Sequence, residues 1–442
     1  MIGRDGFGRI WPRGGHRWSP YTPSPLTGDG IVDPDEAPAM LRFVLHLGEQ
    51  LFRSGAETGT VEAAVLAATR HLGMGHLQID FAARSIHLQY SPPGERPMVM
   101  LRTITTDGAR DLHRLSRLHR VVGRLLAGEL DLKGASAEVD RIAGAGAGRP
   151  WWVDVAGGAV LAAMICLQAG GTQGGAVLAA LLLVLVNRVG RLFGRVGIPA
   201  FYTTAAQAAL TVGAGAVAFA AGLSGQAVAG MLAANLVLLL PILSVVSLAE
   251  DAIMGFPQIA AGRAITVTML VGGIIAGTAI TGSLVLDRSG FELAAYGVSF
   301  AALPFGLSLL SSAVGAAGNT LFNGGSVRLV PLGVAAGLLA GLVNQLMLAL
   351  LHSPPLAALA AATVLGAWAA VVGTCFGVPS AATTLPGVTG ALLPGPTVYA
   401  SLVQYAKGSA AAPGLLLSAL ATTAAIGVGV VLGTLLATRP SK

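Results

Sequence analysis

Apolar blocks long enough to cross a bilayer fill the chain after Trp151, and they constrain its fold more than any other feature. A helix needs about 20 apolar residues to span a ~30 Å hydrocarbon core. We count ten blocks of about this length, at residues 151–168, 171–187, 198–221, 226–248, 264–286, 292–316, 328–351, 355–378, 384–406 and 413–437. The sequence therefore predicts an α-helical polytopic membrane protein with ten spans.

Charged residues gather before these blocks. Of the 48 Asp, Glu, Lys and Arg residues, 34 lie in residues 1–150, although only 11% of the whole chain is charged. An ordinary soluble domain carries roughly 25%. A single soluble globule is therefore excluded, and we expect a soluble head followed by a membrane domain. The arginines are scattered and are not interleaved with aromatic residues, so no nucleic-acid partner is expected.

The first 150 residues divide by composition and periodicity. Residues 1–35 are rich in Gly, Pro and Arg and lack the apolar run of a secretory signal, so we interpret them as a disordered cytoplasmic tail. In residues 36–145, apolar residues first recur at helical spacing, then alternate with polar ones between Gly and Pro clusters, and then return to helical spacing. This order predicts a small α/β cytoplasmic domain at residues 36–145. A glycine-rich linker leads from this domain into the bilayer.

The basic residues of the loops test the number of spans, because cytoplasmic loops carry an excess of Lys and Arg. With the head inside, eight basic residues face the cytoplasm and only Arg288 and Lys407 face outward. The eight are Arg149, Arg188, Arg191, Arg195, Arg263, Arg328, Arg439 and Lys442. This asymmetry supports ten spans in the cell (inner) membrane, with both termini in the cytoplasm.

Ten spans divide into two sets of five, and an odd number places the second set in the opposite orientation. We therefore predict two inverted five-helix repeats, at residues 146–286 and 287–442. The fourth and ninth spans contain Pro241 and Pro394, and each proline lies 14 residues before a glycine. Proline removes a backbone donor and clashes with the preceding turn, so both spans are expected to be kinked or broken.

Broken backbone at membrane depth is tolerated only where it is buried in protein or lines a cavity. In secondary transporters, paired interrupted helices hold charged solute groups near the midplane. The chain has no GxxxxGK[ST] loop for ATP, which favours a gradient-driven carrier. The alternative for each span is a kink that serves only helix packing and binds no ligand. The candidate substrate-binding residues are Asn235, Pro241, Pro394, Gly395, Thr397 and Tyr399.

Two acidic residues follow the first of these breaks. A charge at the bilayer centre costs on the order of 2.5–3.5 kcal/mol on insertion scales, so carboxyls near a broken helix are functional candidates. Glu250 and Asp251 are therefore the candidate proton-coupling residues. The alternative is an ordinary interfacial ion pair with Arg263.

A distinctive block precedes the second expected helix of the head, SGAETGTVEAAVLAATRHLG at residues 54–73. Together with three later segments, this block resembles the bacterial threonine/serine exporter family over about residues 38–437. The three segments are RLHRVVGRLLAGELDLKGASAEVDRI, PILSVVSLAEDAIMGFPQIAAGRA and LLPGPTVYASL. The resemblance implies a cytoplasmic N-terminal domain, ten spans, and export of L-threonine and L-serine driven by the proton motive force. The head motif that carries it consists of Ser54, Gly55, Glu57, Thr58 and Glu62.

Within that motif, Glu57 and Glu62 are either a functional carboxylate pair or groups that favour a helix N-terminus. The two cysteines, Cys166 and Cys375, do not have the spacing of metal ligands, and the histidines do not have it either. No metal and no cofactor are therefore expected.

Together these features predict a secondary exporter, not an enzyme, whose partners are threonine or serine, protons and the lipid bilayer. A homo-oligomer is compatible with this prediction. The alternatives are an exporter of a small dicarboxylate such as succinate, implied by a split relative, and a membrane-anchored enzyme with a catalytic head.

Overall fold

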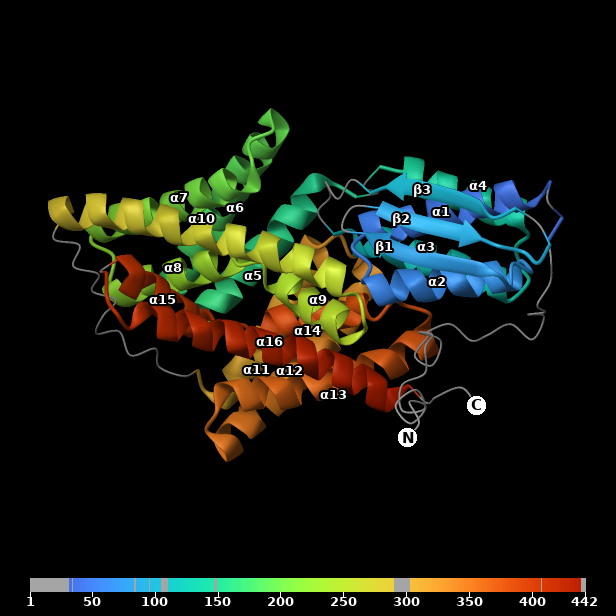
Figure 1. Cartoon of the computed structure of the whole chain (residues 1–442). Coiled ribbons are helices and arrows are strands. Elements are labelled where there is room, and N and C mark those ends of the chain that lie inside the picture. The colour runs from blue at the N-terminus through green and yellow to red at the C-terminus, as the bar shows by residue number, and fades with distance from the viewer. Residues whose placement is uncertain are drawn as a thin grey trace, which may run out of the picture.

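The computed structural model describes residues 32–33, 35–82, 85–94, 96–104, 110–146, 149–289, 303–406 and 408–438. Most of the expected tail, residues 1–35, and the first part of the expected sixth span, 292–316, lie outside the described residues. The described chain forms a head with a small sheet, packed on one end of an elongated bundle of helices (Figure 1).

The head consists of one antiparallel sheet and four helices. Its strands lie side by side in the order β1-β2-β3. Ile86, Leu88 and Tyr90 alternate along β2 and are fully buried, so one face of the sheet packs on the helices. The elements are α1 (Ala37–Arg53), α2 (Thr58–His71), β1 (Leu77–Ala82), β2 (Ser85–Tyr90), β3 (Met98–Thr103), α3 (Leu112–Leu126) and α4 (Leu132–Gly144).

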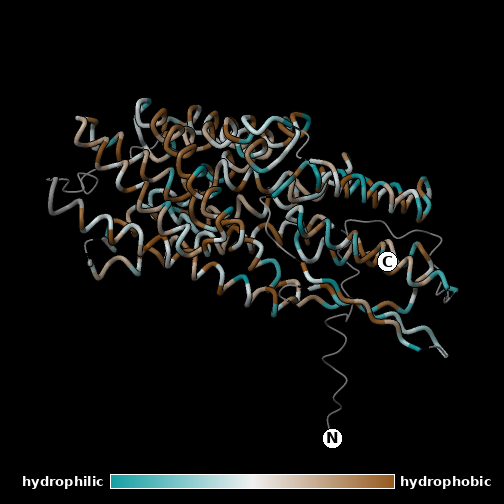
Figure 2. Tube along the Cα trace, turned by 90° about the horizontal axis from the view of Figure 1, so that it is seen from above, coloured by the Kyte–Doolittle hydropathy of each residue, from teal (hydrophilic) through white to brown (hydrophobic). Residues whose placement is uncertain are grey.

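The bundle is entirely helical in the part of the chain that the structure describes. Its helices are α5 (Trp151–Gln168), α6 (Gln173–Val196), α7 (Ala200–Ala220), α8 (Gly225–Leu239), α9 (Ile242–Ile253), α10 (Pro257–Ser289), α11 (Phe305–Phe322), η4 (Val327–Leu329), α12 (Val330–Leu351), α13 (Pro354–Phe376), α14 (Ala381–Ala391), α15 (Gly395–Ala406) and α16 (Ala412–Ala437). Large apolar side chains such as Leu181, Ile265 and Leu350 are more than 60% exposed on its outside, as expected of helices that face lipid. Apolar residues also follow most of its helices in Figure 2.

Nine candidate spans are present among the described residues, each long and apolar enough to cross a membrane. They correspond to the expected spans one to eight and ten. The sixth differs in its end, because α11 continues to Phe322 where the sequence predicted an end at 316. Asn319 explains the difference, since its buried amide donates to the carbonyl of Leu385 at 3.0 Å and the polar residue therefore stays inside the helix.

The ninth expected span is two short helices, α14 and α15, separated at residues 392–394. The fourth is likewise interrupted between α8 and α9 at Leu240 and Pro241, although together these two helices are long enough to cross a membrane. The breaks fall at the two prolines that the sequence singled out. Pro241 has φ −79° and ψ 53°, and Ile242 donates its N–H to the carbonyl of Leu240 at 2.8 Å, as in an inverse γ-turn.

The head and the bundle share one apolar core. Ile259 of α10, Leu329 of η4 and Leu385 of α14 are buried in the same cluster as the helices of the head. The rings of Phe81 in β1 and Phe256, just before α10, meet edge to face with centroids 5.8 Å apart. This continuous packing holds the head at one end of the bundle.

Candidate functional site

The site begins with the segment that joins α1 to α2 in the head. Ser54 is fully buried, its hydroxyl donates to the carbonyl of Gln50 at 2.7 Å, and its own carbonyl accepts the N–H of Asp111 at 3.2 Å. Gly55 has φ +90°, which favours glycine. A Cβ atom at Gly55 would lie 2.6 Å from Cγ of Arg110. The Ser-Gly pair therefore positions Arg110, whose side chain lies across the glycine.

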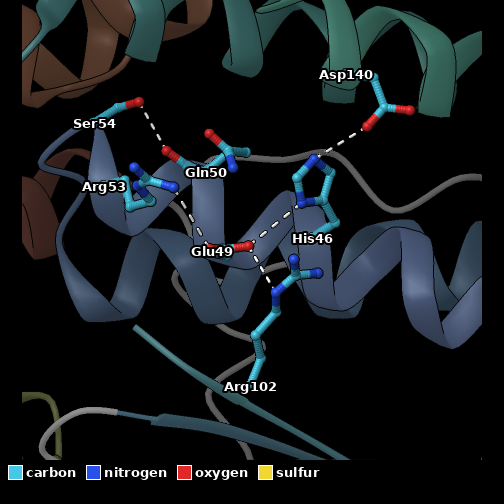
Figure 3. A network of polar contacts seen from close by, with 7 residues as sticks. All are labelled: His46, Glu49, Gln50, Arg53, Ser54, Arg102 and Asp140. Carbon is cyan, nitrogen blue, oxygen red and sulfur yellow. Dashed lines mark hydrogen bonds and ion pairs between the residues drawn. The ribbon is translucent and has the colours of Figure 1, made fainter. Parts of the chain in front are cut away.

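A polar network in the head holds α1 in place (Figure 3). The carboxylate of Glu49 accepts from Arg102 of β3 at 2.8 Å and lies 3.7 Å from Arg53. His46 contacts the same carboxylate at 3.4 Å and Asp140 of α4 at 3.2 Å. The network joins α1 to β3 and α4, so the segment after α1 starts from a fixed position.

Glu57 stands at the N-cap position of α2 with an extended backbone, but its side chain makes no capping hydrogen bond. Burial raises the pKa of Glu57, the Arg110 guanidinium opposes that shift, and Asp251 and Arg263 also act on it. The carboxyl of Glu57 is therefore subject to charges of both the head and the bundle, and it does not cap its own helix.

The partners from the bundle lie in the last turn of α9 and the start of α10. Asp251 is 2% exposed and its Oδ2 is 2.7 Å from Nε of Arg263, so the ion pair that the sequence left open is present. Glu250 is also buried, and its Oε2 accepts no hydrogen bond from the described residues. Arg110 reaches α9 as well, where its Nη2 is 3.4 Å from the hydroxyl of Ser247.

We call these five residues the junction cluster: Glu57, Arg110, Glu250, Asp251 and Arg263. The cluster contains three carboxyls and two guanidiniums, contributed by head and bundle together. If all five were ionised, one negative charge would be left in a largely buried setting, which is unfavourable. The cluster can therefore hold one additional cation or proton.

A cavity of about 160 Å³ lies beside the junction cluster. The head contributes Glu57, Glu62 and His119 to its wall, and burial raises the pKa of Glu62. The bundle contributes Glu250, Asp251 and hydroxyl side chains. Those hydroxyls belong to Thr374, Ser380, Thr384, Thr434 and Thr438. Carboxyl oxygens beside hydroxyl groups suit a small solute that carries an ammonium group.

The residues expected to bind substrate at the broken helices lie elsewhere. Asn235 is fully buried, and its amide donates to the carbonyls of Ala179 and Met231 at 3.2 and 3.1 Å. Tyr399 is 2% exposed, whereas Thr397 is half-buried. A Cβ atom at Gly395 would lie 4.0 Å from Val237, so α15 packs beside α8.

The two breaks therefore meet at one apolar cluster, which contains Val237 and Ile242 from the first break and Val398 from the second, with Leu393 packed against it. None of the six expected residues lines the 160 Å³ cavity. The structure brings Glu57 and Glu62 together with Glu250 and Asp251, and it leaves the substrate-binding set as a separate group.

Sequence reasoning missed Arg110 and His119. Arg110 is one of many arginines in the head, and nothing in its spacing distinguishes it. His119 lies within α3 with no ligand-like neighbour in the sequence. His119 reaches the site because α3 contacts α14 of the bundle, and Arg110, just before α3, reaches it beside Ser247 of α9.

His119 provides a test of burial at this site. Burial lowers its pKa from 6.5 to about 4, whereas an unfolded histidine titrates near 6.5. The folded state therefore binds fewer protons between these values, and the free energy of unfolding falls as pH drops from about 6.5 to about 4. Between pH 7 and pH 4, we expect the free energy of unfolding of the natural protein to fall by up to about 3 kcal/mol more than that of His119→Gln.

Thermal unfolding of the purified natural protein and of His119→Gln, measured across this pH range, checks the prediction. Glu57 and Glu62 are present in both proteins, so their opposite pKa shifts cancel in the difference. Parallel pH profiles for the two proteins would contradict a buried neutral histidine.

The head, the candidate spans and the two broken helices define the class to which the chain belongs, the multi-pass membrane transporters. The family model ThrE, described as "Putative threonine/serine exporter", matches residues 42–285, more than half of the chain, and the chain belongs to this family.

Two relatives match nearly the whole chain. It is 28% identical to a protein of Mycobacterium tuberculosis named "Probable threonine/serine exporter", over 94% of this chain and 80% of that protein. It is 22% identical to the "Threonine/serine exporter" of Corynebacterium glutamicum, over 94% of this chain and 86% of that protein. No solved structure matches the chain at a significant level.

Proposed function

We propose that this protein exports small hydroxy amino acids, L-threonine and L-serine, across the cell (inner) membrane in exchange for protons, with both termini in the cytoplasm. The names of the two relatives support the solute class. The observation that carries the proposal is the cavity beside the junction cluster, at the end of the bundle that the head covers. If the head is cytoplasmic, a solute leaving the cell reaches this cavity first.

The charge of the junction cluster suggests how export and proton entry are coupled. Its one excess carboxyl can bind a proton or pair with the ammonium group of an amino acid, but once protonated it no longer offers that ammonium group a negative charge. Solute and proton would therefore compete for the same carboxyls, which is the elementary requirement for exchange. The raised pKa of Glu57 supports this role, because protonation then occurs nearer to physiological pH.

We also infer that the bundle consists of two inverted repeats of five spans, with the two broken helices as equivalent elements. Pro241 and Pro394 are 153 residues apart, and each is the central residue of a turn in which the following N–H donates to the preceding carbonyl. Further along, Phe256 donates to Asp251 in the first half. Ser409 donates to Gln404 in the second half, again 153 residues later.

Close helix crossings support the same repeat. In α10, Gly273 and Gly277 lie directly against backbone carbonyls of α7. In α16, Gly429 and Gly433 lie against backbone carbonyls of α13, and each is 156 residues after its counterpart. The third and fifth spans therefore pack as the eighth and tenth do.

The repeat is incomplete in one respect that bears on function. At the offset of 153, Glu250 and Asp251 correspond to Val403 and Gln404, which cannot ionise. The acidic pair thus belongs to one end of the bundle only, where the head is docked. This difference supports a role for the pair at the cytoplasmic entrance and not at a symmetric midplane site.

Restoring continuous helix at the second break is expected to reduce transport at least tenfold while the protein remains inserted. The double substitution Pro394→Ala with Gly395→Ala supplies the missing donor and removes the flexible residue. Pro413→Ala with Gly414→Ala is the matched control, since this pair lies at the start of α16, where Gly414 faces open space. Efflux assays with both variants measure the effect, and normal efflux after the first double substitution would remove the ninth span from the mechanism.

The proposed function is tested with purified protein in proteoliposomes, using labelled threonine and an imposed proton gradient. We expect gradient-dependent movement of threonine that unlabelled serine inhibits and alanine inhibits less. An ionophore that collapses both pH gradient and membrane potential should abolish net movement against a concentration gradient. Unchanged movement would overturn proton coupling, and inhibition by succinate alone would replace the amino-acid proposal with dicarboxylate export.

A further inference from the structure

A second cavity at the junction of head and bundle is lined by basic side chains. It has a volume of about 300 Å³ and lies between α3 and α4 of the head, the start of α5 and the segment before α12. Its basic residues are His113, Arg114, Arg117 and Arg149. Its single acidic residue, Asp111, already accepts the N–H of Arg114 at 2.9 Å as the N-cap of α3.

This cavity adjoins a third one of about 650 Å³, with which it shares His113, Ser326 and Val327. The third cavity adds Arg120 and Arg328 and has no acidic residue in its wall. We call the two cavities together the basic groove. Its five arginines and one histidine come from the head and from both halves of the bundle.

Part of the basic groove is fixed in position by hydrogen bonds. Arg149 pairs with Asp154 at 2.6 Å and donates to the carbonyl of Gly325 at 2.7 Å, while Arg114 donates to the carbonyl of Ala145 at 2.8 Å. The guanidiniums of Arg117 and Arg328 make no hydrogen bond or ion pair with the described residues. The groove therefore combines a fixed wall with two cations available to a ligand.

The arginines of the groove also act on His113. Burial lowers the pKa of His113, Asp111 opposes the shift, and Arg117, Arg120 and Arg149 lower it further. Three guanidiniums thus converge on one imidazole from α3 and the linker. Such a concentration of positive charge favours an anion.

Apolar side chains lie beside these charges. Val327 is 76% exposed and Phe376 is 67% exposed, and both line the third cavity. Trp151 and Trp152, at the start of α5, are about 60% exposed as well. Tryptophan is typical of the boundary between membrane and water, so the basic groove opens where the bilayer surface meets the head.

We propose that the basic groove binds the headgroup phosphate of an anionic phospholipid, whose acyl chains lie along Val327 and Phe376. Basic pockets between membrane helices on the cytoplasmic side are suited to such headgroups. Inorganic phosphate also offers an anionic phosphate group but cannot use the exposed apolar side chains. Because the groove joins α3 to α5 and α12, the bound lipid would fasten the head to the bundle.

The double variant Arg117→Gln with Arg328→Gln tests the proposal. The matched control is Arg191→Gln with Arg195→Gln, which removes two exposed arginines near the end of α6 on the same expected side of the membrane. The full-length proteins are purified in detergent, and binding of added phosphatidylglycerol, phosphatidylcholine and inorganic phosphate is measured by native mass spectrometry and by thermal shift.

We expect the natural protein and the control to bind phosphatidylglycerol in preference to phosphatidylcholine. The groove variant should bind phosphatidylglycerol about 30-fold more weakly, at about 1 kcal/mol for each arginine. Equal losses in the groove variant and the control would show that the lipid senses only total charge and would overturn the proposal. Displacement of phosphatidylglycerol by millimolar inorganic phosphate would assign the groove to a soluble anion instead.

Discussion

Substitution of Gly433 by alanine is expected to deplete the folded protein from the membrane. Helix α16 crosses α13 so closely that a Cβ atom at Gly433 would overlap the carbonyl oxygen of Thr363. One turn earlier, a Cβ atom at Gly429 would lie 2.6 Å from the carbonyl oxygen of Leu359. Both contacts are with backbone, so no side-chain rotation can relieve the clash, and the two helices must separate.

Separation at this crossing carries a large penalty, because helices in a bilayer associate chiefly through close van der Waals packing at small residues. Overpacking a core ordinarily lowers the free energy of unfolding by about 1–3 kcal/mol, and we expect the loss from a clash with backbone to lie at or above the top of this range. The yield of monodisperse protein in detergent and its thermal unfolding midpoint measure the effect. Gly277→Ala should behave in the same way, since its Cβ atom would overlap the carbonyl of Ala205 in α7.

Gly414→Ala is the control in the same helix. Nothing lies within 4 Å of the Cβ atom that it adds, and alanine is a better helix former than glycine by about 1 kcal/mol. We expect normal yield and an unchanged or slightly higher midpoint. Equal behaviour of Gly414→Ala and Gly433→Ala would show that α13 and α16 do not approach as closely as described.

The sequence predicted the helices better than their contacts. Block length and hydropathy are local properties, so nine of the ten expected spans coincide with segments able to cross a membrane. The breaks at Pro241 and Pro394 were also predictable, because proline acts on its own helix. Gly429 and Gly433 are visible as a spacing of four, but the sequence does not say that α13 is the partner.

The candidate site was predicted only in parts. Glu57 and Glu250 could each be selected from the sequence, one from a head motif and one from a charge in an apolar block. Their place beside one cavity depends on how the head docks on the bundle, where Phe81 and Phe256 pack across the junction. No periodicity encodes a contact between residues almost 200 positions apart.

Replacement of Arg110 by methionine is expected to abolish transport and to destabilise the docked head. The change keeps a long side chain beside Gly55 but leaves Glu57, Glu250 and Asp251 with Arg263 as the remaining guanidinium of the junction cluster. Arg110 opposes the effect of burial on Glu57, and a buried charge that loses its compensation typically costs a few kcal/mol, up to about 5. Threonine efflux and the thermal unfolding midpoint measure the two effects.

A second substitution separates stability from function. In Arg110→Met with Glu57→Leu, guanidinium and carboxyl are removed together, and apolar replacement of a whole buried pair is often neutral or stabilising. We expect the unfolding midpoint to recover while efflux stays lost, since one excess carboxyl remains on α9 but the head no longer supplies Glu57 as a carboxyl for a proton or an ammonium group. Arg53→Met, which affects an exposed guanidinium 3.7 Å from Glu49, should change stability by less than about 1 kcal/mol. Recovery of efflux in the double variant would mean that Glu57 and Arg110 only dock the head, and the exchange of proton and solute would then have to rest on Glu250 and Asp251 without them.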